Sequence, residues 1–73
     1  MTAIIFKGWK KGMRGISFIL LLREHTDLSL KTAKNIKERI VDGEVFKLSV
    51  DELSTAQKIV EDATELGVIC ELE

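Results

Sequence analysis

Two side chains in this sequence could carry out chemistry, His25 and Cys70. A histidine can act as a general base and a cysteine as a nucleophile, but catalysis also needs a third group that orients the pair. No Cys-His or Ser-His-Asp order with such a third group is present. His25 is expected in a turn between helices, beside Glu24 and Asp27, and Cys70 as a small core residue of a strand. We therefore predict that the protein is not an enzyme.

Three glycines occur in a basic loop near the N-terminus. Gly8, Gly12 and Gly15 match neither the Walker pattern nor the dinucleotide fingerprint, and turns explain them equally well. One aromatic residue lies among the basic ones, so the loop could stack on a nucleic acid and contact its phosphates. The alternative is a solvated hinge with the aromatic ring over the sheet edge. Because the net charge is −1 and the chain lacks tyrosine, we do not expect a dedicated nucleic-acid binder. The loop contains Lys7, Trp9, Lys10, Lys11 and Arg14.

Charge divides unevenly between the two halves of the chain. Met1 to Ile40 contains nine Lys or Arg and three Asp or Glu, a balance of +6. Val41 to Glu73 contains two Lys or Arg and nine Asp or Glu, a balance of −7. Such a chain can present one basic and one acidic face. These faces are either binding surfaces or simply two solvated surfaces.

The length of 73 residues allows one domain, which we assign to residues 1–73. A single cysteine excludes an internal disulfide, and without a Cys/His cluster neither a structural metal nor a cofactor is expected. The longest apolar run, Phe18 to Leu22, is far shorter than the ~18–20 residues that cross a bilayer. No secretory signal is visible, so we predict a cytoplasmic protein with no membrane partner.

The hydrophobic pattern predicts an α+β domain in which helices cover one face of a small sheet. Ser29 is the expected N-cap of the second helix, Ser49 and Glu52 form a capping-box sequence before the third, and Gly67 ends the third. The predicted order is a strand at Thr2–Lys7, a loop at Gly8–Gly15, helices at Ile16–His25 and Leu30–Val41, a short strand or extended link at Glu44–Leu48, a third helix, and a strand at Val68–Leu72. The composition of Ile16–His25 would also allow a strand.

The first helix has more apolar positions than one buried stripe requires. A surface helix normally has a single apolar stripe. Here a second set of apolar residues, Phe18, Leu21 and Leu22, is present in addition to Ile16, Ile19 and Leu20. Part of this helix is therefore either deep in the core or at an interface with a partner. A second copy of the chain, which would make a homodimer, is one such partner.

One segment spans the first two predicted helices and contains Arg23, Thr26, Leu28, Leu30, Lys31, Ala33 and Lys34. It resembles the C-terminal domain of the bacterial ribosomal stalk protein, which has the same residue types in a characteristic run at this place, and the likeness continues loosely to the closing strand. Four positions depart from the family. Gly15 and Leu20 stand where it has lysines, and Asp27 and Ser29 stand where it has two glycines.

This resemblance implies the order β-α-α-β-α-β with a three-stranded antiparallel sheet. It also implies a protein partner that meets the first two helices, since the stalk domain recruits translation GTPases there. Arg23 and Lys34 are the matching basic contacts, and we add Lys31, Phe18 and Leu20 to the predicted protein-binding residues. The chain has neither the dimerising segment nor the flexible hinge of the stalk protein, so we expect a free-standing relative. The Clp protease adaptor shares the fold, but the basic loop has the wrong charge for the cationic α-amino group which that adaptor binds.

A second hypothesis places function on the third helix. Asp51, Glu61, Asp62 and Glu65 would form an acidic face, and Glu61 and Glu65 are like charges one turn apart, which is unfavourable by ~0.2–0.5 kcal/mol. Such a face would suit an inhibitor or immunity-type protein that occludes a basic surface, for example that of a nuclease toxin.

Overall fold

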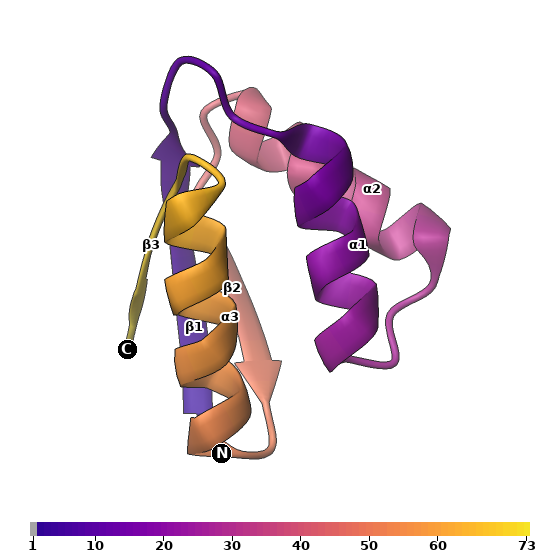
Figure 1. The fold of residues 1–73 in the computed structure, drawn as a ribbon, viewed down its shortest axis with the longest axis vertical. Helices are drawn as coiled ribbons and strands as arrows, with labels where there is room; N and C mark the ends of the chain where they lie inside the picture. The colour runs from indigo at the N-terminus through magenta and orange to yellow at the C-terminus, as the bar shows by residue number, and fades with distance from the viewer. Residues whose placement is uncertain (1) are drawn as a thin grey trace.

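A computed structural model describes residues 2–73, and it contains the predicted order of strands and helices. The sheet has the strand order β2-β1-β3, and both neighbours pair antiparallel with β1 (Figure 1). The predicted α+β fold class is therefore confirmed. The elements are β1 (Thr2–Trp9), α1 (Gly15–His25), α2 (Leu30–Val41), β2 (Phe46–Val50), α3 (Leu53–Glu65) and β3 (Val68–Leu72).

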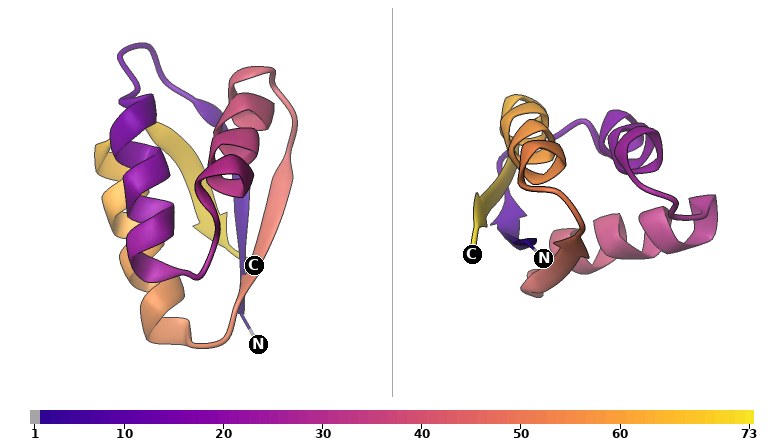
Figure 2. Two further views of the ribbon diagram at one scale, coloured as in Figure 1. Left: turned by 90° about the vertical axis from the view of Figure 1, so that its right-hand side faces the viewer. Right: turned by 90° about the horizontal axis from the view of Figure 1, so that it is seen from below.

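The helices lie on one face of the sheet, as the end-on view in Figure 2 shows. Alternation along the strands explains this arrangement, since successive side chains of a strand point to opposite faces. Ile4 and Phe6 of β1 are fully buried beneath the helices, whereas Lys7 is exposed. On the uncovered face Lys7 pairs with Glu71 of β3 at 2.7 Å. The sheet therefore has one core face and one charged, solvated face.

The core joins all three helices to the sheet. Phe18 of α1 packs edge-to-face on Phe6 with ring centroids 5.5 Å apart. Each helix buries one stripe whose members recur every three or four residues, as helical geometry requires. No buried side-chain nitrogen or oxygen atom among residues 2–73 is without a hydrogen-bond partner. The buried stripes are Phe18, Leu21 and Leu22 on α1, Ala33, Ile36 and Ile40 on α2, and Ala56, Ile59 and Ala63 on α3.

The structure corrects the expected capping box. Ser49 lies inside β2, where it pairs with Ala3, and the strand continues to Val50 because Leu48 and Val50 both enter the core. The N-cap of α3 is Glu52, which makes no side-chain capping hydrogen bond. The end of α3 agrees with the prediction, since Gly67 follows it with φ +96°.

The loop after β1 is shorter than predicted. Gly8 and Trp9 continue the strand, pairing with Ile69 and Val68 of β3 beyond a bulge near Lys7. Trp9 is consequently held at the end of a strand rather than in a free loop.

Ser29 caps α2 as predicted, since its hydroxyl oxygen accepts a hydrogen bond from the Thr32 amide at 3.2 Å. We expect Ser29→Ala to lower the free energy of unfolding by about 1 kcal/mol, the usual cost of losing such a cap. Urea denaturation followed by circular dichroism measures this change. Ser49→Ala is the matched control and should change stability by less than about 0.5 kcal/mol. Equal losses in the two variants would contradict the assignment of Ser29 as the cap.

Candidate protein-binding surface

The structure divides the apolar residues of α1 between the core and the surface. Phe18 has none of its side chain exposed, so its predicted role as a protein contact is wrong. It lies on the inward stripe because the sheet requires a large side chain against Phe6. Leu20 points the other way and is 56% exposed, and Ile16, one turn before it, is 78% exposed. Apolar side chains on both sides of α1 therefore reflect a core stripe and a separate solvent-facing ridge.

The basic residues predicted from the first two helices are all exposed. Arg23 continues the Ile16–Leu20 ridge by helical spacing, and Lys31 and Lys34 lie on the neighbouring α2. Leu30, Lys34 and Val41 repeat along α2 at spacings that place them on one side of that helix. We call this surface the hairpin surface, and it consists of Ile16, Leu20 and Arg23 on α1 together with Leu30, Lys31, Lys34, Lys37 and Val41 on α2.

At Gly15 the start of α1 lies against a side chain of α2. A Cβ atom at this position would lie 2.7 Å from Cε of Lys37, so the missing side chain lets Lys37 cross the start of α1. Lys37 thereby brings an ammonium group to the start of the α1 ridge. Sequence reasoning did not single out Lys37, whose spacing from Lys34 could have placed it on the same face.

Trp9, at the end of β1, contacts the hairpin surface at Val41. The indole Nε1–H of Trp9 donates a hydrogen bond to the carbonyl oxygen of Val41 at 3.1 Å. Trp9 remains 43% exposed, so one part of the ring is fixed and another faces solvent. A hollow of about 310 Å³ lies at this junction, lined by Trp9, Met13, Gly15, Ile16, Lys37 and Val41.

The four predicted acidic residues lie at both ends of the third helix. Glu61 and Glu65 are exposed one turn apart near the end of α3, whereas Asp51 precedes its start. The helix between these ends is about 18 Å long at 1.5 Å per residue. Asp62 is partly covered, and its carboxylate oxygens lie 3.7 Å from Lys58 Nζ and 3.9 Å from His25 Nε2. Asp51 therefore lies apart from the other three residues of the predicted acidic face.

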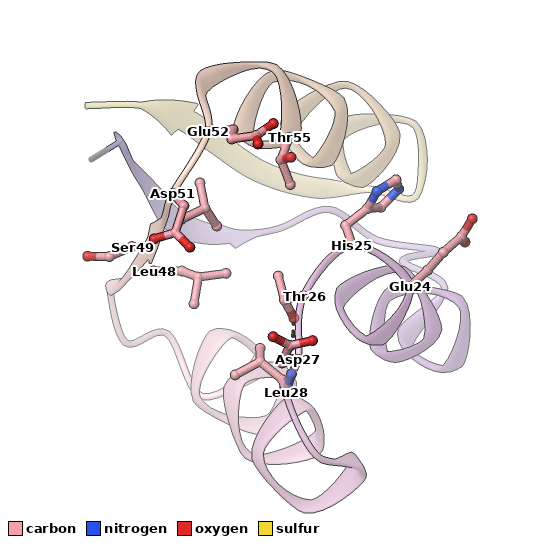
Figure 3. A pocket seen from close by; sticks show the side chains of 11 residues that line it. Glu24, His25, Thr26, Asp27, Leu28, Leu48, Ser49, Asp51, Glu52 and Thr55 are labelled. Carbon is pink, nitrogen blue, oxygen red and sulfur yellow. Dashed lines mark hydrogen bonds between the residues drawn. The ribbon is translucent and has the colours of Figure 1, made fainter.

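A second, larger pocket of about 500 Å³ lies between the end of α1, the turn before α2, β2 and the start of α3 (Figure 3). Carboxylates from Glu24, Asp27, Asp51 and Glu52 line it together with His25. This lining would attract positive charge. However, no group of three or more His, Cys, Asp or Glu side chains within residues 2–73 is arranged to hold a metal ion.

His25 and Cys70 have different contact partners in the structure. The Cys70 thiol lies 3.8 Å from the Val60 carbonyl oxygen and 3.9 Å from the Thr64 hydroxyl, whereas His25 approaches Asp62. Burial raises the pKa of the Cys70 thiol, and the Thr64 hydrogen bond opposes that rise only in part. Cys70 is thus mainly a protonated, partly buried thiol that packs against the core, as the sequence indicated.

Comparisons of the chain with protein-family models, with curated proteins and with solved structures returned no significant match. In the part of the chain that the structure describes, no helix has the length and apolar character needed to cross a membrane. A function for this chain therefore has to be inferred from its exposed apolar and charged residues.

Proposed function

We propose that this domain is a non-catalytic interaction module that binds a partner protein through the hairpin surface. The observation that carries this proposal is the outward ridge on α1, where Ile16 and Leu20 are 78% and 56% exposed. Exposed aliphatic side chains that lie together gain free energy when a partner removes them from water, by about 25 cal/mol per Å² buried. The core does not need this ridge, since Phe18, Leu21 and Leu22 supply the inward stripe.

Charge around the ridge supports the same surface. None of the ion pairs within residues 2–73 involves Arg23, Lys31, Lys34 or Lys37. The lysines that do form ion pairs, Lys7, Lys47 and Lys58, belong to β1, β2 and α3. The cations of the hairpin surface are therefore available to a partner, where they would steer association and fix orientation more than they add affinity.

We further propose that the domain is a relative of the ribosomal stalk C-terminal domain. The order of elements and the antiparallel sheet agree with that family, and Arg23 and Lys34 are exposed on α1 and α2. The structure also gives a context for the two positions where the family has lysines, Gly15 and Leu20. Lys37 crosses over Gly15 and places a cation where the family has a lysine, whereas Leu20 makes its position apolar.

A comparison of charge reversals tests the proposal. The immobilised protein and its variants would be incubated with native lysate, and the retained proteins compared by quantitative mass spectrometry. We expect Arg23→Glu with Lys34→Glu to reduce a specific partner by at least about tenfold, because two favourable charges become repulsive. Glu61→Lys with Glu65→Lys should retain that partner.

The opposite pattern would contradict the proposal. Loss of the partner only on reversal of Glu61 and Glu65 would assign binding to α3, the surface of an inhibitor-type protein. Circular dichroism of each variant shows whether it is folded. The substituted side chains are exposed, so their effect on stability should be within about 0.5 kcal/mol.

A further inference from the structure

We infer that the hollow lined by Trp9, Met13, Gly15, Ile16, Lys37 and Val41 is a binding subsite for an acidic, amphipathic helix of the partner protein. This inference rests on the proposed function and adds a place and a chemical class to it. The hollow lies beyond the Arg23 and Lys34 contacts, at the opposite end of α1 from Arg23.

The walls of the hollow are fixed before any partner arrives. Trp9 belongs to β1 and is tied to the last residue of α2 by the Nε1–H to Val41 hydrogen bond of 3.1 Å. The following loop is tied to the turn between α3 and β3, since the Lys10 amide donates to the Gly67 carbonyl oxygen at 2.7 Å. A pre-ordered site avoids the entropic cost of ordering side chains on binding. Rigid walls favour a binding subsite over a loop that merely covers the core.

The lining of the hollow favours an aliphatic side chain as its occupant. Trp9 and Val41 are 43% and 39% exposed, and Ile16 is 78% exposed at the rim. From Ile16 the ridge continues to Leu20, about 6 Å away along the helix at 1.5 Å per residue. A partner helix presents apolar side chains at the same three- and four-residue spacing, so one can enter the hollow while the next packs on Leu20.

The charges around the hollow select an acidic partner. Lys37 of α2 lines the hollow, and Lys10, Lys11 and Arg14 belong to the loop that joins its Trp9 to its Gly15. None of these four cations takes part in an ion pair within residues 2–73. A second copy of the chain would bring these like charges together, which opposes a symmetric dimer through this surface. Glutamates that flank the apolar side chains of a partner helix would meet these cations instead.

Two other anionic partners fit the surface less well. A single-stranded nucleic acid is bound mainly by stacking on several aromatic side chains, but Phe6 and Phe18 are buried here and Arg39 lies over the ring of half-buried Phe46. An anionic membrane presents a broad, flat surface, whereas the hollow is concave and fits a single projecting side chain. The observations therefore favour a protein helix.

Trp9 provides a direct test because it is the only tryptophan in the chain. The 73-residue chain, labelled with ¹⁵N, would be titrated with a synthetic helical peptide of about 15 residues that has leucines on one face and glutamates on the other. We expect a saturable shift of the Trp9 indole resonance. The Kd should rise by about tenfold or more in Ile16→Asp and in Lys37→Glu.

Matched controls separate the hollow from general effects. Leu53→Asp replaces another exposed apolar residue, at the start of α3, and Lys58→Glu reverses a lysine of α3, so both should bind the peptide as the unmodified protein does. A peptide with the same composition and a scrambled order should not bind, since it has no apolar face. Circular dichroism and the dispersion of the amide spectrum identify any variant that is unfolded. For an unfolded Ile16→Asp, Ile16→Ser is the second variant.

Several outcomes would overturn the inference. One is an unshifted Trp9 resonance at peptide concentrations up to about 1 mM, which corresponds to about 4 kcal/mol of binding free energy. Another is tighter binding of oligouridylate, or of vesicles containing phosphatidylglycerol, with the same dependence on Ile16 and Lys37. Dimerisation in sedimentation equilibrium that Ile16→Asp abolishes would assign the hollow to a second copy. If the natural partner is lost with Arg23→Glu and Lys34→Glu but retained by Ile16→Asp, the proposed function stands and the subsite does not.

Discussion

Phe18→Ala is expected to lower the free energy of unfolding by about 3–5 kcal/mol, the usual cost of truncating a buried phenylalanine. Phe18 is completely buried and contacts Phe6 edge-to-face, so the substitution removes an aromatic pair and leaves a cavity between α1 and the sheet. A domain of 73 residues has a total stability of roughly 4–11 kcal/mol. The variant should therefore unfold at a much lower urea concentration or be largely unfolded without urea.

The control for this prediction is Leu20→Ala, two residues along the same helix. Leu20 is 56% exposed, so its truncation should change stability by less than about 1 kcal/mol. Urea denaturation followed by circular dichroism compares the two variants, and the Trp9 fluorescence gives a second probe. Similar losses at Phe18 and Leu20 would show that α1 does not separate a core stripe from an outward ridge, and would remove the basis of the proposed binding surface.

Gly67→Ala is expected to be the second most damaging of the substitutions described. Gly67 has φ +96°, a conformation that costs a residue with a side chain about 1–3 kcal/mol. A Cβ atom there would also lie 3.0 Å from the Cα atom of Met13, which is backbone and cannot rotate away. The loss should therefore exceed the conformational cost alone. The Trp9 fluorescence should also change, because the Gly67 carbonyl accepts the Lys10 amide hydrogen bond that holds the loop.

Gly43→Ala separates the conformational cost of a positive φ from the cost of a steric contact. Gly43 has a similar φ of +88°, but nothing lies within 4 Å of the position where its Cβ atom would be. Its substitution should cost only the conformational part, about 1–3 kcal/mol, and should leave Trp9 fluorescence unchanged. Thermal and urea unfolding of both variants measure the difference. A loss at Gly67 equal to or smaller than that at Gly43 would contradict the close packing of the α3–β3 turn on the loop.

The sequence determined the elements that depend on local chemistry. Ser29 was recognisable as a cap and Gly67 as a helix-ending glycine because both act through neighbouring backbone groups. The alternation of Val68, Cys70 and Leu72 similarly indicated a strand with one inward face, which the structure contains. By contrast, Ser49 and Glu52 have the sequence of a capping box, but Ser49 does not cap α3. It pairs with Ala3 in the sheet instead.

Only the tertiary structure decided what the apolar and charged residues do. The sequence showed that α1 is apolar on more than one side, but the position of the sheet made Phe18 a core residue and left Ile16 and Leu20 outside. Among the predicted acidic residues, Glu61, Asp62 and Glu65 lie close together near the end of α3, whereas Asp51 is separated from them by most of the length of the helix. The hollow at Trp9 was not predictable, since it joins the end of β1 to the end of α2. Contacts between distant segments depend on how the elements pack, which local sequence patterns do not specify.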